Sequence, residues 1–196
     1  MTDVHGGSPT EPLPERTLSV TVNGIERHVQ CPDRALLVEL VREGLGLSGT
    51  HIGCLTGDCG ACTLMVDGRI VKSCLMLAAS VDGAALTTVE GLGQGGRLHP
   101  IQQAFWDHDG FQCGFCLPGH LFAALDLLTV NSAPTDDQIR AALGGNLCRC
   151  TGYEKIVESV RAAAELIAHG GEQRVDGGGR ATGADQPSAR AAEARP

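Results

Sequence analysis

The sequence predicts an α+β fold in which a sheet-rich first half is followed by an all-helical second half. Two hairpin signals lie before residue 75, where short β-prone segments flank an Asn-Gly pair and an Asp-Gly pair. Beyond residue 98, apolar residues recur at helical spacing in four segments. Eight of the nine cysteines form two sets of four, one set in each half. Each half therefore carries its own candidate metal centre.

Length, charge and cysteine usage limit the classes of function. The 196 residues are enough for one medium domain or two small ones. A formal net charge of −8 argues against nucleic-acid binding, because phosphates would repel the chain. No run approaches the roughly 18 apolar residues of a membrane span, so we expect no membrane insertion. The polar N-terminus lacks the apolar core of a secretory signal, and together with the odd number of cysteines this favours a cytoplasmic protein with reduced thiols.

The first elements lie around the Asn-Gly turn. Residues 1–16 are polar and contain prolines, and we expect them to form a disordered lead-in. Strands are predicted over 17–22 and 25–30, on either side of that turn. Asp33 is expected to cap a helix over 35–43, whose leucine and valine residues form one apolar stripe.

A second hairpin follows after a glycine-rich loop. Its strands are predicted over 63–66 and 69–72, around the Asp-Gly turn, and 85–89 is predicted as one more strand. Two hairpins, a crossing helix and a loop make a small α+β domain, which we place at residues 17–92. This arrangement fits a β-grasp domain of the plant-type ferredoxin kind.

The rest of the chain is predicted to be helical. A linker at 93–98 leads into a helical domain at 99–169, and the composition of 170–196 indicates a disordered tail. Helices are expected from Pro100 to about His108, over 118–129, from a capping box at 135–138 to the residue before Gly144, and over 153–169. The segment 91–96 satisfies G-x-G-x-x-G, but no second strand follows it, so we interpret it as an interdomain linker rather than a dinucleotide site.

The first cysteine set has the spacing C-x4-C-x2-C, with a fourth cysteine after eleven intervening residues. Its members are Cys54, Cys59, Cys62 and Cys74. This is the plant-type pattern for a [2Fe–2S] cluster, which needs four thiolates and a loop of small residues whose amides reach the cluster sulfurs. A zinc site would more commonly use two separated pairs, so the spacing favours the iron–sulfur cluster over zinc and over a disulfide framework.

The second set consists of a C-x2-C pair and a C-x-C pair. Its members are Cys113, Cys116, Cys148 and Cys150. Each pair lies at or just before the start of a predicted helix, where the positive end of the helix dipole stabilises thiolates. On spacing alone either zinc or a [2Fe–2S] cluster could occupy this set, although C-x-C is less usual for structural zinc. The ninth cysteine, Cys31, is expected to be a small buried apolar residue.

Longer motifs around both sets carry a family resemblance. The segments 112–116, Gln-Cys-Gly-Phe-Cys, and 144–153, Gly-Gly-Asn-Leu-Cys-Arg-Cys-Thr-Gly-Tyr, closely resemble the iron–sulfur subunit of molybdenum hydroxylases. This family includes xanthine dehydrogenase, aldehyde oxidoreductase and aerobic carbon monoxide dehydrogenase. Motifs of its N-terminal domain match at 53–54, 59–62, 73–74 and 88–91. The resemblance covers roughly residues 17–168. The sequence departs from many members at Leu117 and His120, where they have Thr and Met.

The resemblance implies a β-grasp [2Fe–2S] domain, a four-helix [2Fe–2S] domain and two partner subunits. These are a large subunit with a molybdopterin cofactor and a medium subunit with FAD, assembled as a dimer of heterotrimers. Electrons would pass from molybdenum to the second cysteine set, then to the first set and to FAD. The resemblance also places Gln112 and the sulfur of Cys150 in contact with the pterin. It implies no catalytic residue in this chain, because the large subunit transforms the substrate.

Two other functions stay open at this stage. A free-standing two-cluster ferredoxin would not need the helical domain with Gln112 and the 148–153 motif. A zinc-stapled interaction module would use the second set, but the spacing of the first set argues against it.

Overall fold

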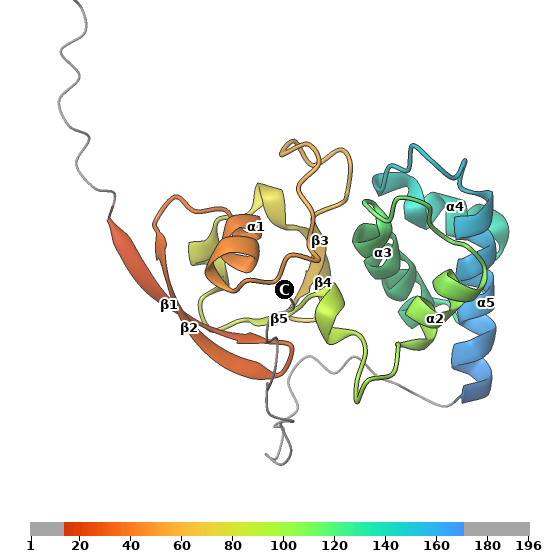
Figure 1. Ribbon diagram of the computed structural model, residues 1–196, viewed down its shortest axis with the longest axis horizontal. Helices are drawn as coiled ribbons and strands as arrows, with labels where there is room; N and C mark the ends of the chain where they lie inside the picture. Colours follow the sequence, from red (N-terminus) through yellow and green to blue (C-terminus); the bar gives the residue numbers. More distant parts are fainter. Residues whose placement is uncertain (1–13, 171–196) are drawn as a thin grey trace, which may run out of the picture.

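The computed structural model describes residues 14–170, and it confirms the α+β class. A five-stranded mixed sheet is formed by the first half, and the second half consists of four helices beside it (Figure 1). No helix among the described residues is both long and apolar enough to cross a membrane. The lead-in expected at 1–16 lies mostly outside the described residues, and so does the tail expected at 170–196.

The outer part of the sheet is the hairpin of β1 (Glu15–Val22) and β2 (Ile25–Pro32). Asn23 and Gly24 both have positive φ, at 51° and 80°, as the two-residue turn requires. The alternate residues Leu18, Val20 and Val22 are buried, so one face of the hairpin lies on the core. The strand begins at Glu15, so the prediction that residues 15 and 16 belong to a disordered lead-in was wrong.

The remaining strands place β5 in the centre of the sheet. The order is β2-β1-β5-β3-β4, where β3 is Thr63–Val66, β4 is Arg69–Lys72 and β5 is Ala85–Thr87. Strand β5 runs parallel to β1 and antiparallel to β3. The β3–β4 hairpin has the boundaries expected from its Asp-Gly turn, while β5 is two residues shorter than expected.

The crossing helix differs from its prediction. Helix α1 covers only Leu37–Glu39 and continues as a π-helical turn, η1, over Leu40–Gly44. Asp33 does not cap it: the Asp33 carboxylate pairs with the Arg16 guanidinium at 2.6 Å and ties the ends of β1 and β2 together. The Glu39 carboxylate instead accepts a hydrogen bond from the Leu36 amide at 2.8 Å.

All four predicted helices of the second half are present. They are α2 (Pro100–Asp107), α3 (Leu117–Val130), α4 (Asp136–Ala142) and α5 (Glu154–Gly170), with a 3₁₀ turn, η5, at Leu143–Gly145. The capping box at Thr135 and Gln138 forms as expected. The segment 91–96 runs into a turn that is closed by two backbone hydrogen bonds between Gln94 and Arg97, and the next element is α2.

A continuous apolar core joins the two halves. Leu64 and Met65 of β3 belong to the same buried cluster as Leu121 and Phe122 of α3. Helix α3 lies against β3 and β4, and its N-terminal end, next to Cys116, is close to the loop between η1 and β3 (Figure 1). The fold therefore brings the loops that carry the two cysteine sets to the junction of the two halves.

Candidate metal centres

The first cysteine set gathers around the loop that precedes β3. Cys62 and Cys74 are buried against Val38 of α1, while Cys54 and Cys59 are half-buried. The thiols form two hydrogen-bonded pairs, Cys59 with Cys54 and Cys74 with Cys62. A negative charge on Cys54 would also raise the pKa of Cys74, which indicates that the two pairs lie near each other. The structure thus brings all four predicted residues together.

Backbone amides of this loop point at the sulfurs. The amides of Thr56 and Cys59 donate to Cys54 Sγ at 3.4 and 3.5 Å. Hydrogen bonds from Thr56 and then from Cys59 lower the pKa of the Cys54 thiol to about 6. Such amides stabilise anionic sulfur, whether it is a free thiolate or a metal ligand.

The second cysteine set gathers between the N-terminal end of α3 and the loop before α5. Cys113 and Cys150 are exposed and their sulfurs are 3.6 Å apart. Cys116 and Cys148 are more buried and form the other hydrogen-bonded pair. Thr151 contacts Cys148 Sγ twice, with its hydroxyl at 3.1 Å and its amide at 3.4 Å.

In each pair one thiol has a raised pKa, because burial or the neighbouring thiol disfavours its thiolate form. Burial and the hydrogen bond to its partner raise the pKa of Cys74 to about 11 and that of Cys116 to about 12. By contrast, hydrogen bonds from Thr151 lower the pKa of Cys148, although burial acts in the opposite direction. A full set of four thiolates therefore requires a bound cation at each site.

The pairing of the sulfurs at each site fits a two-iron centre. Tetrahedral zinc requires four ligands around one centre. In a [2Fe–2S] cluster each iron takes two protein thiolates, and bridging sulfides fill its other positions. Two pairs of sulfurs per site match that requirement.

Gln112 lies at the exposed edge of the second site. Its side chain is exposed, as are those of Cys113 and Cys150, so these residues are open to a group outside the chain. An amide side chain can donate and accept hydrogen bonds at once. The structure places Gln112 beside the second cysteine set, as the sequence motif predicts.

Tyr153 supports the second site in a way that spacing did not reveal. Its hydroxyl accepts a hydrogen bond from the Cys148 amide at 2.9 Å and donates to the Asn146 carbonyl at 3.2 Å. Its φ of 72° is unusual for a residue with a side chain, and these contacts hold it there. The only sequence signal was its place at the end of the 144–153 motif.

The two sites are joined by direct contacts between their loops. The Leu147 amide, next to Cys148, donates to the Cys59 carbonyl at 2.9 Å. His51 Nδ1 donates to the Phe115 carbonyl at 2.8 Å, and the two rings stack with centroids 4.9 Å apart. Since Phe115 lies between Cys113 and Cys116, both loops of the second site touch the first.

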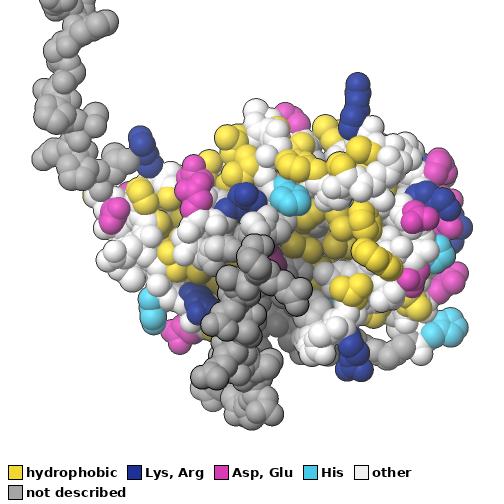
Figure 2. Space-filling model, in the orientation of Figure 1, with side chains coloured by type: hydrophobic (Ala, Val, Ile, Leu, Met, Phe, Trp, Pro, Cys, Tyr) yellow, Lys and Arg dark blue, Asp and Glu magenta, His cyan; other side chains and the backbone are white. Residues whose placement is uncertain are grey.

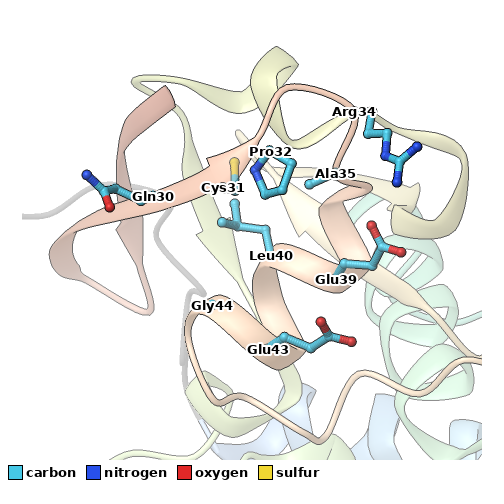
Figure 3. A pocket seen from close by; sticks show the side chains of 9 residues that line it. All are labelled: Gln30, Cys31, Pro32, Arg34, Ala35, Glu39, Leu40, Glu43 and Gly44. Carbon is cyan, nitrogen blue, oxygen red and sulfur yellow. The ribbon is translucent and has the colours of Figure 1, made fainter. Parts of the chain in front are cut away.

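Cys31 belongs to neither site. It is buried in the apolar core, and its sulfur is turned away from Glu39 and Glu43 (Figure 3). A surface hollow of about 380 Å³ lies beside it, between β2 and α1. None of the eight other cysteines lines this hollow, so it does not extend either site.

Large apolar side chains are exposed around both sites. Phe115 and Leu147 are exposed beside the second set, and Leu55 and Leu75 are exposed beside the first. Figure 2 shows hydrophobic side chains across the middle of one face, while mixed acidic and basic side chains gather at the outer edge of the helical half. Exposed apolar patches of this kind are typical of surfaces that bind another protein.

Two known domain families match the chain. The family described as "2Fe-2S iron-sulfur cluster binding domain" matches residues 20–88, and "[2Fe-2S] binding domain" matches residues 88–161. The chain thus carries two domains of [2Fe–2S]-binding type, one for each cysteine set.

Characterised relatives cover most of the chain. The nicotine 6-hydroxylase small subunit of Paenarthrobacter nicotinovorans is 48% identical over 152 residues, which are 78% of this chain and 92% of that subunit. The iron-sulfur-binding subunit PaoA of the Escherichia coli (strain K12) aldehyde oxidoreductase is 43% identical over 172 residues, 80% of this chain and 75% of that subunit. The aldehyde oxidoreductase of Megalodesulfovibrio gigas is 44% identical over 151 residues, 76% of this chain, but the match spans only 17% of that longer protein.

A solved structure has the same fold. A chain of quinoline 2-oxidoreductase from Pseudomonas putida 86 superposes with a TM-score of 0.77 at 44% identity, covering 80% of this chain and 98% of that chain.

Proposed function

The chain belongs to the iron–sulfur subunits of the molybdenum hydroxylases, and from this premise we propose that it relays electrons between a molybdopterin site in a large subunit and FAD in a medium subunit. Membership makes it an electron-transfer subunit of an oxidoreductase. The observation that carries the finer proposal is the pairing of the thiols at two sites that touch each other.

We assign one [2Fe–2S] cluster to each cysteine set. Four residues, Cys54, Cys59, Cys62 and Cys74, would hold the cluster on the flavin side. Cys113, Cys116, Cys148 and Cys150 would hold the cluster on the molybdenum side. When bound, such a cluster accepts and releases one electron at a time. The pairwise sulfur contacts and the amides directed at Cys54 and Cys148 support the assignment.

The chain's own part is to hold the two sites close and to keep their loops rigid. The hydrogen bond from the Leu147 amide to the Cys59 carbonyl joins the segment before Cys148 to a ligand of the other site. This hydrogen bond offers one short electron path between the two sites. No general base or nucleophile is assigned here, because substrate chemistry belongs to the large subunit.

Exposure at the two sites supports the proposed partners. Gln112 and Cys150 would contact the molybdopterin, and the exposed Phe115 and Leu147 would pack against the large subunit around them. Leu75, exposed beside the first site, would pack against the FAD subunit. The complete enzyme is proposed to be a dimer of such heterotrimers in the cytoplasm.

The strand order supports a division into two known domain types. A sheet ordered β2-β1-β5-β3-β4 and crossed by α1 is what a β-grasp domain at 17–92 requires, and a linker at 93–98 then leads to the four helices of 99–169. The matches at 20–88 and 88–161 divide the chain at nearly the same place.

Metal analysis of the full chain, purified without oxygen, tests the proposal. Two clusters predict about four irons and four sulfides per chain, with two distinct electron paramagnetic resonance (EPR) signals after dithionite reduction. About two irons with stoichiometric zinc would contradict the second cluster and support a structural metal in the helical half. Isolation of the chain without large and medium subunits from its native source would support a free-standing ferredoxin instead.

A further inference from the structure

We propose that Lys72 is a positioning residue that fixes the two cluster loops against each other and whose charge raises the reduction potential of the first-site cluster. This inference rests on the proposed function, since it concerns the same two sites. Lys72 is the last residue of β4 and lies two residues before Cys74.

The ammonium group of Lys72 bridges the two loops directly. Its Nζ donates to the carbonyl of Gly57 at 2.6 Å, inside the first loop between Cys54 and Cys59. It also donates to the carbonyl of Gly145 at 2.7 Å, three residues before Cys148. A single side chain thus satisfies backbone acceptors from both sites, which are 88 residues apart in sequence.

Lys72 is the one charged side chain among the polar contacts that join the loops. The other contacts are the Leu147–Cys59 backbone hydrogen bond and the His51–Phe115 pair. Both carbonyl partners of Lys72 are neutral, and none of the ion pairs between described residues includes it. Its positive charge is therefore not cancelled by a neighbouring carboxylate within the described part of the chain.

That charge favours reduction of a neighbouring cluster. A [2Fe–2S] cluster held by four thiolates is anionic, and it gains a further negative charge when reduced. A nearby cation stabilises the more negative form and raises the reduction potential. The charge should raise the potential of the first-site cluster more than that of the second-site cluster. Lys72 lies two residues before Cys74 and donates to a carbonyl inside the Cys54–Cys59 loop.

The potentials of both clusters in full-length variants test the role of the charge. We expect K72Q to lower the ratio of reduced to oxidised first-site cluster at a fixed applied potential by roughly threefold to tenfold, with a smaller change at the second site. K72R, which keeps the charge, should behave like wild type. K155Q removes the only other lysine of the sequence, whose exposed side chain pairs with Glu158 on α5, and should leave both potentials unchanged. Unchanged potentials in K72Q, or equal shifts in K72Q and K155Q, would overturn the proposal.

Hydrogen exchange tests the bridge independently of redox behaviour. K72M removes both hydrogen bonds, so amides of the segments 57–60 and 145–148 should exchange faster than in wild type. Unchanged exchange in both segments would overturn the positioning role. If K72Q binds no iron, the iron content and potentials of K72R are measured instead. Wild-type values in K72R would support the need for a cation at this position, and loss of iron in K72R would contradict it. A wild-type chain without two clusters would instead contradict the proposed function itself.

Discussion

Two glycines, Gly60 and Gly119, let the two halves pack tightly at their junction, where a β-carbon would not fit. A β-carbon on Gly119, in the first turn of α3, would clash with the Gly60 carbonyl and would lie 2.7 Å from Asn146 Oδ1. Gly60 in the first cysteine loop and Asn146 near Cys148 thus meet α3 at one point. Asn146 Oδ1 is buried there and has no hydrogen-bond partner among the described residues.

This packing predicts that G119A destabilises the chain. Because the clash involves backbone of the other half, we expect a loss of about 1–3 kcal/mol in the free energy of unfolding. Gly144 is the matched control, since a β-carbon there meets nothing within 4 Å and its backbone needs no positive φ. Urea unfolding of both variants measures the difference. Equal stability of G119A and G144A would show that the junction leaves room for a β-carbon at residue 119.

Ligand loss at one site should leave the other site loaded. We expect C59S to lose the first-site cluster, about two irons per chain, while the second-site EPR signal persists. C31A is the control, because Cys31 is buried in the core and belongs to neither pair. Iron analysis and EPR spectra of the three proteins decide the matter. Two unchanged cluster signals in C59S would remove Cys59 from the assignment.

Residue spacing predicted which cysteines gather but not what joins the two sets. The C-x4-C-x2-C and C-x2-C patterns are local, and each places its sulfurs in one loop. Lys72, His51 and Asn146 act across the junction of the two halves, and no periodicity or spacing marks such long-range contacts. Their roles became visible only in the fold.

At the scale of elements, the Glu158 carboxylate links α5 to the end of α2. Glu158 on α5 accepts a hydrogen bond from Lys155 at 2.8 Å, and it lies 3.2 Å from His108 at the end of α2. Hydrogen bonds from Lys155 and then from His108 hold the pKa of Glu158 below its ordinary value of 4.5. A carboxyl group whose pKa is lowered by folding stabilises the fold at pH values above its unfolded-state pKa. This stabilisation is lost as the pH falls through the folded-state pKa.

This shift predicts a stability difference that depends on pH. E158Q should unfold at lower urea concentration than wild type at pH 7, and the difference should disappear at pH values below the lowered pKa of Glu158. E165Q, on the same helix without an ion pair among the described residues, should match wild type at both pH values. A difference between E158Q and wild type that persists unchanged in acid would contradict the ionic origin.

The elements whose boundaries are marked by local sequence signals were predicted well. The crossing helix, whose length depends on packing, was not. Both hairpins carry turn pairs that fix their register, and α4 carries its own capping box. The crossing helix had the right apolar residues but shortened to α1 and the π-helical η1. Asp33 was predicted to cap this helix, but its carboxylate pairs with Arg16 of β1 instead.

At the scale of the whole molecule, the core does not divide at the predicted domain boundary. Leu64 of β3 and Phe122 of α3 belong to one buried cluster, and α3 lies against β3 and β4. The sequence favoured two units joined by a linker, because hydrophobic periodicity shows that a helix has a buried face but not what covers it. The shared core is what keeps the two sites in contact.

A shared core predicts that both halves unfold together. Trp106 and Tyr153 both lie in the helical half, so intrinsic fluorescence follows that half alone. Hydrogen exchange of β1 and β3 amides across a urea series follows the sheet. Because removing α3 would expose Leu64 and the face of β3, we expect the two probes to give the same midpoint. Two separate midpoints would mean that the junction contributes little stability, and that the contacts between the sites depend on the partner subunits.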